Sequence, residues 1–333
     1  MSWYRTLIPS QLARSGRVAL AIAASALGAG AVAGPALAAP IVDGSGNYTF
    51  QKINNNTDPT FNQLLGINDS GLIAGYFGSG QAGHPNQGYL LSPPYGKGIY
   101  RSENFPGSVQ TQVTGLNNRG VTVGFYSHQN NANLVNENAG FYRTDGGAFH
   151  AVKFPTSDNS APPVNQLLGV NDRDIAVGFY TDNNATNHGY SYNIRTQMFH
   201  SITVSGDSNV TAAAINDLND VAGFATNSAG NTEAFLLRSN GTLITLDVPG
   251  ATSTQAFGVN NGDQVVGDYV DGTGSTATMH GFTWTPRRGF ETVNDPDGTD
   301  TTTINGVNDR GELVGFYVDA AGNTDGMLAT PQP

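Results

Sequence analysis

The side chains best suited to chemistry occur at one position that recurs along the chain. Six times a polar stretch is followed by a small residue and then an apolar one, and the residue just before this pair varies. In chain order it is Gln87, Ala139, His188, Glu233, His280 and Asp325. Histidine and carboxylate side chains are zinc ligands, and each ligand of one ion must lie about 2 Å from it. The elements that carry these residues decide whether they can share an ion.

An acidic loop offers a second kind of chemistry. Residues 294–300 contain three aspartates, Asp295, Asp297 and Asp300. Carboxylate oxygens are calcium ligands, but this spacing does not fit the EF-hand loop. We therefore interpret the segment as a solvated turn and keep calcium binding as the alternative. No other cofactor is expected, because the chain has no nucleophile elbow, no phosphate-cradling loop and no H-E-x-x-H helix.

A twelve-residue sequence segment, which we call the phrase, recurs six times along the chain. It indicates the elements that position these side chains. It occupies residues 66–77, 115–126, 169–180, 214–225, 258–269 and 306–317. A period of roughly 40–50 residues with several short strands per unit is typical of a propeller blade. Each phrase reads as a hairpin whose turn needs one residue at positive φ. Only types that tolerate this conformation stand there, namely Gly71, Gly120, Asp174, Asn219, Asp263 and Gly311.

After each of the first five phrases the sequence predicts a third and a fourth strand. After the sixth phrase it predicts a third strand only. Residues 47–53 read as a strand without a hairpin partner, so we predict that they pair with the last blade. The predicted fold is all-β, a six-bladed β-propeller of four-stranded antiparallel blades closed by this N-terminal strand. It is one domain over residues 39–333, with blades at about 61–105, 110–154, 164–204, 209–248, 253–294 and 301–330 plus 47–53.

This fold places the recurring polar residues apart. The third strand of a blade lies two strand spacings, about 9.5 Å, beyond the innermost one. With 60° between blades, third strands of neighbouring blades are separated by at least that distance. His188, Glu233 and His280 therefore should not share a zinc ion.

Two sets of residues recur in every copy of the phrase and are interpreted as structural. A mid-strand glycine indicates a close backbone approach, which we assign to the convergence of the sheets on one axis; these are Gly75, Gly124, Gly178, Gly223, Gly267 and Gly315. A repeated asparagine either forms a ring of amides at the channel mouth or caps its own turn, and capping is the preferred interpretation. These residues are Asn68, Asn117, Asn171, Asn216, Asn260 and Asn308.

Composition limits the location and the partners of the protein. Residues 1–38 combine three arginines, an apolar run rich in Ala and Gly, and Ala36-Leu37-Ala38, which is typical of a cleaved signal peptide. We expect a protein exported to the periplasm or the medium, monomeric and without a membrane span. The formal net charge is −11, which argues against nucleic acid as a partner. Cysteine is absent, so packing and sheet closure must stabilise the fold without disulfides.

The phrase also resembles a known family. Its pattern G-[ILV]-N-[DN]-x-G-x-[IV]-[AV]-G-[FY]-[YF], with Asn187-His188-Gly189-Tyr190, His280-Gly281-Phe282 and Asp247-Val248-Pro249-Gly250, is similar to the HAF repeats of bacterial extracellular proteins. The resemblance covers residues 47–330. It implies an exported β-propeller and implies no settled activity.

The long, variable loops should share one face of such a propeller, and function on a rigid scaffold usually lies on variable loops. These loops are rich in Asn, Thr, Ser, Gly and Gln, which suits hydrogen bonding to an extracellular glycan or protein. The preferred hypothesis is therefore a binding module. The alternatives are an enzyme with a site at the channel mouth (a lactonase, lyase or metal-dependent hydrolase) and a structural envelope or matrix protein. The candidate binding residues are His84, His128, Glu137, Asp182, His188, Asp271, His280 and Asp319.

Overall fold

A computed structural model describes residues 41–81, 83–95, 100–129, 138–155 and 164–333. The expected signal peptide and Glu137 lie outside these ranges. Within them the chain is all-β, apart from two short 3-10 helices, η1 (Ser45–Asn47) and η2 (Gly274–Thr276). No helix in the described ranges has the length and apolar character needed to cross a membrane.

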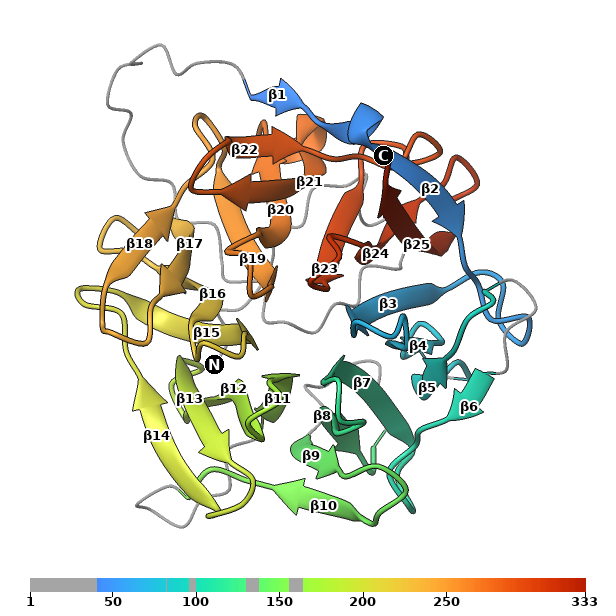
Figure 1. Cartoon of the computed structure of the whole chain (residues 1–333), viewed down its shortest axis with the longest axis vertical. Coiled ribbons are helices and arrows are strands. Elements are labelled where there is room, and N and C mark those ends of the chain that lie inside the picture. The colour runs from blue at the N-terminus through green and yellow to red at the C-terminus, as the bar shows by residue number, and fades with distance from the viewer. Residues whose placement is uncertain (1–40, 82, 96–99, 130–137, 156–163) are drawn as a thin grey trace, which may run out of the picture.

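Strands that follow each other in the chain pair antiparallel and form sheets around a central axis (Figure 1). The first sheet contains β3 (Asn62–Ile67), β4 (Ile73–Phe77), β5 (Gln87–Leu91) and β6 (Tyr100–Ser102). The second contains β7 (Gln110–Leu116), β8 (Thr122–Ser127), β9 (Ala139–Arg143) and β10 (Phe149–Val152). The third contains β11 (Val164–Val170), β12 (Ile175–Thr181), β13 (Asn187–Asn193) and β14 (Met198–Ile202).

The next two sets of four strands join with the short strand β1 into one mixed, nine-stranded sheet. Separate antiparallel sheets had been expected here. We call these sets the fourth and fifth sheets. The fourth contains β15 (Ser208–Ile215), β16 (Val221–Thr226), β17 (Thr232–Leu237) and β18 (Leu243–Leu246). The fifth contains β19 (Ser253–Val259), β20 (Val265–Asp271), β21 (Thr278–Thr285) and β22 (Gly289–Thr292).

Two parallel pairings make that sheet mixed. A single bridge, Thr232 to Ser253, joins the fourth sheet to the fifth. The short strand β1 (Val42–Asp43) pairs parallel with β22 and covers an outer edge that would otherwise be free. Isolated parallel bridges also link Met279 to Thr301 and Thr324 to Phe61. Contacts between consecutive sheets therefore include backbone bridges as well as side chains.

The last sheet combines the two ends of the described chain. It contains β23 (Thr302–Val307), β24 (Leu313–Val318), β25 (Thr324–Pro331) and β2 (Tyr48–Lys52). The strand β2 pairs antiparallel with β25, from Tyr48 opposite Pro331 to Lys52 opposite Met327. We call this the sixth sheet. The segment that lacked a hairpin partner in the sequence thus supplies the outer strand of this sheet.

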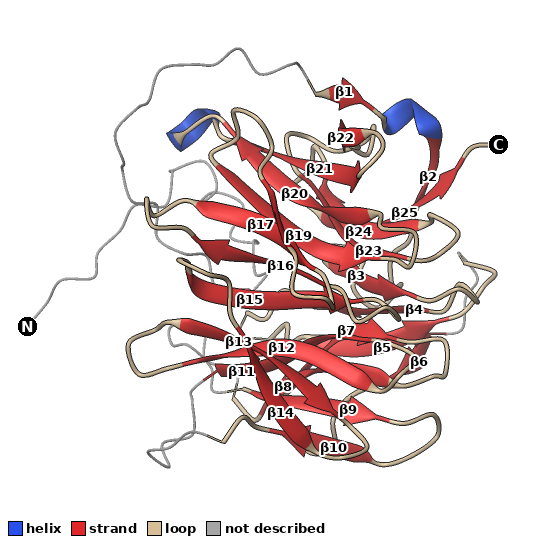
Figure 2. Cartoon of the chain, turned by 60° about the vertical axis from the view of Figure 1, so that its left-hand side comes forward, coloured by secondary structure: helices blue, strands red, loops and turns tan. Residues whose placement is uncertain are grey.

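The apolar core lies between neighbouring sheets, which stack face against face (Figure 2). One cluster brings Val123 of the second sheet against Leu167 and Tyr190 of the third. Another brings Val314 and Leu328 of the sixth sheet against Leu64 of the first. Because the sixth sheet packs on the first in the same way as the second packs on the third, the arrangement continues around the axis.

The phrase forms a hairpin in every sheet, as predicted. All six turn positions have positive φ, and three of them are not glycine: Asp174 (61°), Asn219 (63°) and Asp263 (63°). These hairpin turns lie at one end of the strands, together with the turns between third and fourth strands. We call this end the tight-turn face. The opposite end, with the second-to-third loops and the connections between sheets, is the loop-rich face.

The assigned cause of the mid-strand glycines was wrong. Each inner strand carries a β-bulge, for example between Leu64 and Gly66 in β3. A Cβ atom on Gly75 would lie 2.3 Å from the carbonyl oxygen of Gln63 in the same sheet, and one on Gly315 would lie 1.9 Å from that of Thr303. The close approach is therefore made within each hairpin. Convergence of neighbouring sheets is seen instead at Gly66, whose Cβ would lie 3.3 Å from the Cα of Gly115.

Candidate functional site

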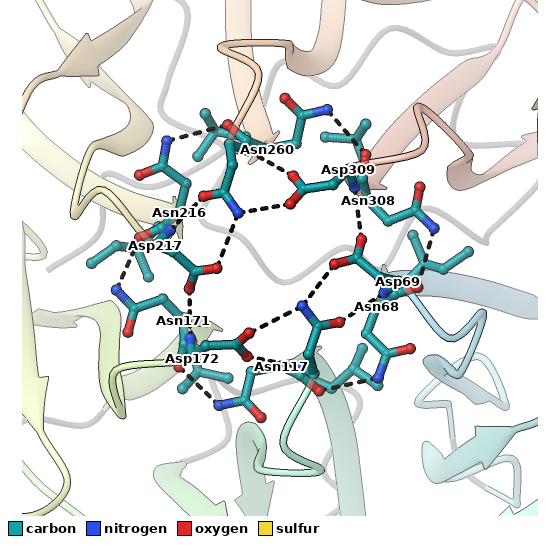
Figure 3. A pocket seen from close by; sticks show the side chains of 18 residues that line it. Asn68, Asp69, Asn117, Asn171, Asp172, Asn216, Asp217, Asn260, Asn308 and Asp309 are labelled. Atoms are coloured by element: carbon teal, nitrogen blue, oxygen red, sulfur yellow. Dashed lines mark hydrogen bonds between the residues drawn. The ribbon is translucent and has the colours of Figure 1, made fainter.

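The central channel opens on the tight-turn face into a small hollow of about 70 Å³ (Figure 3). Two consecutive residues of each phrase surround it, an asparagine and then an aspartate or a second asparagine. The hairpin turns hold both residues at the innermost point of each sheet. The mouth of the channel is therefore built from copies of one short element.

The first of these residues form a closed cycle of hydrogen bonds. The side-chain Nδ2 of each asparagine donates to the backbone oxygen of the equivalent asparagine in the next sheet, as from Asn117 to Asn171 at 2.8 Å. The cycle returns to its start when Asn308 donates to the oxygen of Asn68 at 3.1 Å. The remaining donors are Asn68, Asn171, Asn216 and Asn260, at 2.9 to 3.2 Å.

The same asparagines also cap their own turns. The Oδ1 of Asn171 accepts the backbone N–H of Arg173 and of Ile175, both at 3.0 Å. The two alternatives posed by the sequence are thus both present, an amide ring and six capped turns. The oxygen and the nitrogen of these amides are both hydrogen-bonded within the protein. The ring therefore links neighbouring sheets and has few free polar groups for a ligand.

A second cycle, not anticipated from the sequence, lies next to the first. Each residue after the repeated asparagine offers Oδ1 to the backbone N–H of its counterpart in the preceding sheet, as Asp69 does for Asp309 at 2.9 Å. The other bonds of this cycle are 2.7 to 2.8 Å long. Its members are Asp69, Asn118, Asp172, Asp217, Asn261 and Asp309. The signal was available, since every copy carries Asp or Asn there.

Four carboxylates therefore face one another around the channel mouth, separated in part by amides. Asn118 donates to Asp69 and Asp172 on either side, at 2.8 and 3.1 Å. Asn261 does the same for Asp217 and Asp309, at 3.0 and 2.7 Å. In the described ranges no group of three or more His, Asp or Glu side chains is arranged to hold a metal ion.

Deeper in the channel, the bulge residue of each inner strand points inward. These residues leave a narrow hollow of about 30 Å³, bordered also by Gln112 and Phe125. A ligand pocket usually has several hundred Å³, so this hollow and the one at the channel mouth are each smaller than a usual substrate site. The bulge residues are Leu65, Thr114, Leu168, Ala213, Phe257 and Asn305.

One buried carboxylate departs from the repeat. Asp268 stands where the other second strands have an aromatic residue, and it is 3% exposed. Its Oδ2 accepts the hydroxyl of Thr303 at 2.9 Å. Burial raises its pKa to about 7, and no neighbouring charge contributes. A group with such a pKa can exchange a proton near neutrality, but general acid–base chemistry would need a second group beside it, and only the Thr303 hydroxyl is in place.

On the loop-rich face, Asp182 and His188 form the best-defined pair of predicted site residues. His188 Nε2 lies 3.0 Å from Asp182 Oδ2. The hydrogen bond from His188 is the main cause that lowers the pKa of Asp182. The imidazole also stacks on Tyr180, with ring centroids 4.9 Å apart. The pair thus presents a half-exposed ring and a carboxylate at the end of the third sheet.

The other predicted residues interact within their own sheet or with the connection that leads into it. His280 contacts Thr278 and Asn294 at 2.8 and 2.9 Å. His84 lies 3.6 Å from Asp58, and Nδ1 of His128 lies 3.0 Å from the oxygen of Gly107. Asp319 accepts bonds from Asn323 in its own loop, and Asp271 ends β20. The candidate residues are therefore distributed around the face.

The side chains considered as metal ligands, in the third strands and in the acidic loop, form hydrogen bonds within the protein. Glu233 accepts from Asn227, and Asp325 accepts from Lys52 and Asn54. In the acidic loop, Asp295 accepts the N–H of Asp297 at 3.0 Å, and burial raises its pKa to about 6. Asp300 adopts a positive φ of 56°. These aspartates form no metal-binding group in the part of the chain that the structure describes.

Comparison with known proteins identifies the fold and no activity. No family model matches the chain, and no curated protein is significantly similar to it. A protein assigned as TolB from Agrobacterium tumefaciens is similar in structure, with 12% identity over 86% of this chain and 99% of its own, and a TM-score of 0.51. AofleA from Arthrobotrys oligospora has 12% identity over 85% and 88%, with a TM-score of 0.51. The similarity supports an all-β, propeller-like fold.

Proposed function

We propose that the protein is an exported six-bladed β-propeller of the HAF-repeat type, closed by β2 against β25, which binds glycans on its loop-rich face. The two cycles of hydrogen bonds support the six-bladed arrangement, because each returns from the sixth sheet to the first. The leader over residues 1–38 supports export. The candidate residues are distributed rather than convergent, which favours binding over catalysis.

A set of tyrosine–histidine pairs is the observation that carries the proposed ligand. Tyr126–His128, Tyr180–His188 and Tyr269–His280 have ring centroids 5.4, 4.9 and 5.1 Å apart. They lie at the loop-rich ends of the second, third and fifth sheets. Tyr126 and Tyr269 are buried, and the histidine of each of these two pairs is the more accessible ring. A partly exposed imidazole held against an aromatic ring suits a ligand with both apolar CH faces and hydroxyl groups. Repetition around one face would give multivalent binding.

A glycan array probed with the purified protein tests this function. The wild-type protein should bind at least one class of neutral glycan, and His188→Ala should weaken this binding. The triple variant His128→Ala, His188→Ala, His280→Ala should lose it, because multivalent affinity falls with each site removed. The matched control is His150→Ala. His150 stacks on Tyr142 in the same way, at 4.7 Å, but the pair lies toward the tight-turn face.

Two results would overturn the proposal. The first is the absence of any bound glycan together with a protein partner captured by the same surface, which would make the face a protein-binding site. The second is a triple variant that binds as tightly as the wild-type protein and His150→Ala.

A further inference from the structure

The tight-turn face is not uniform, because one of its junctions between sheets is open. At other junctions an arginine of one sheet reaches a carboxylate of the next. Arg119 of the second sheet pairs with Asp174 of the third at 3.2 Å, and Arg238 of the fourth sheet pairs with Asp263 of the fifth. Between the fifth and sixth sheets there is instead a groove of about 710 Å³. That volume lies in the range of small-ligand sites.

The groove is open because the sixth sheet has no carboxylate at the position that an arginine of the fifth sheet would reach. Gly311 stands there, where the third and fifth sheets have Asp174 and Asp263. Arg310 of the sixth sheet pairs with Glu312 of its own hairpin. The turn between β21 and β22 therefore lies beside an unfilled space.

That turn carries two exposed arginines, neither of which bridges to the sixth sheet in the described ranges. Arg287 and Arg288 both line the groove and are exposed. Arg287 makes no ion pair or hydrogen bond through its side chain within the described ranges, and Arg288 lies 3.7 Å from Glu291. They are the only two consecutive basic residues in a sequence with a formal net charge of −11. Such a pair in an acidic protein concentrates positive charge at one place on its surface.

The rest of the lining contains two carboxylates, Asp263 and Glu291, which lie beside Arg238 and Arg288, and several neutral polar groups. Tyr48 of β2 forms one wall, and Gln264 donates to its hydroxyl at 3.4 Å. Burial is the main cause that raises the pKa of Tyr48, so the phenol stays neutral and can donate a hydrogen bond. Thr283 and Thr285 add hydroxyl groups to the lining. Guanidinium groups bind oxyanions in a bidentate manner, and hydroxyls and amides bind hydroxylated ligands.

We propose that this groove is a second binding site, for a small sugar-like ligand that carries an oxyanion. Arg287 and Arg288 bind the oxyanion, which is a carboxylate or a phosphate. Tyr48, Gln264 and the two threonines contact the hydroxylated body. The site lies on the face opposite the tyrosine–histidine pairs, and its chemistry is independent of the proposed glycan binding there.

Titration of the purified protein with three matched probes tests the site. The probes are glucuronate, glucose 6-phosphate and glucose, followed by isothermal titration calorimetry and saturation-transfer NMR. At least one of the charged sugars should bind, and glucose should bind at least tenfold more weakly, because it lacks the oxyanion that forms charge-assisted hydrogen bonds with the arginines. The stronger of the two charged probes identifies the oxyanion.

The double variant Arg287→Gln, Arg288→Gln should weaken binding of the charged probe by tenfold or more without lowering thermal stability. Its control is Arg101→Gln, Arg173→Gln, which removes the same charge from two exposed arginines outside the groove and should bind like the wild-type protein. Equal binding of glucose and the charged sugars would overturn the proposal. So would undiminished binding by the groove variant, an equal loss in the control, or no binding of any probe at 10 mM.

Discussion

The two ends of the strands show how a repeat protein divides its residues between fold and function. At the channel mouth on the tight-turn face, six asparagines each cap a turn and reach the next sheet in the same way. At the loop-rich ends of the third strands, the equivalent residue varies from sheet to sheet. His188 pairs with Asp182, Glu233 with Asn227 and Asp325 with Lys52. Uniform positions stabilise the contacts between sheets, and a varied position that stays accessible, such as His188, can contact a ligand.

The largest effect is expected where the repeat allows no side chain at all. A Cβ atom on Gly315 would lie 1.9 Å from the carbonyl oxygen of Thr303, a backbone atom that cannot rotate away. Gly315→Ala should therefore lower the free energy of unfolding by about 4 kcal/mol or more, or prevent folding. Guanidinium unfolding or the yield of folded protein measures this. The control Gly46→Ala, which has no atom within 4 Å of its Cβ, should behave like wild type.

The buried carboxylate of the fifth sheet should give the next largest effect, and it depends on pH. The pKa of Asp268 is raised from 3.8 to about 7 by burial, so the folded state favours the protonated form. The stability that this proton contributes is complete below about pH 4 and is lost as the pH rises to about 7. At pH 8, Asp268→Asn should unfold with up to about 4 kcal/mol more free energy than wild type.

The difference between two pH values checks this interpretation. The advantage of Asp268→Asn over wild type should be clearly larger at pH 8 than at pH 5, since other titrating groups are common to both proteins. The amide retains an oxygen for the Thr303 hydroxyl. An advantage of the same size at both pH values would show that Asp268 does not titrate in this range, and that its departure from the repeat has no electrostatic cost.

The third largest change in the free energy of unfolding is expected at the ring of asparagines. Asn171→Ala removes two turn-capping bonds and the bond to Asn216, all in a buried setting. We expect a loss of about 3 kcal/mol in the free energy of unfolding. Asn240→Ala is the control, because Asn240 caps an exposed turn through a single bond to Thr242. If both variants lose the same small amount, the cycle contributes no more than its separate turns.

Features that are determined by contacts within a single hairpin could be predicted from the sequence. The positive φ at Asp174 and the cap of Asn171 follow from local turn chemistry. The reason for Gly315 was misjudged, since it depends on a bulge in the facing strand. That strand is buried on both faces, so it has no polar–apolar alternation in which an extra residue would show. The cycle through Asp69 and Asn118 was missed because an Asp or Asn in a turn has a sufficient local explanation.

Features that depend on how two sheets meet were beyond the sequence. The groove beside Arg287 lies where the sixth sheet has Gly311 at the turn position that Asp263 holds in the fifth sheet, and the effect of that difference appears only where the two sheets meet. The pairing of His188 with Asp182 likewise depends on the path of a loop. The expectation that ligand sites lie on the loop-rich face therefore omitted this groove, which lies among the tight turns.

The smallest effect on stability is expected at the loop-rich face. It tests most directly whether the varied positions there contribute less to stability than the uniform positions of the tight-turn face. His188 is half-exposed and its partner Asp182 is also accessible, so water weakens the interaction between them. His188→Ala should change the thermal midpoint by no more than about 1–2 °C, while Asn171→Ala lowers it severalfold more. Differential scanning fluorimetry of both variants under one condition measures this. A large drop in His188→Ala would mean that the varied positions also stabilise the ring, and the division between the two ends of the strands would not hold.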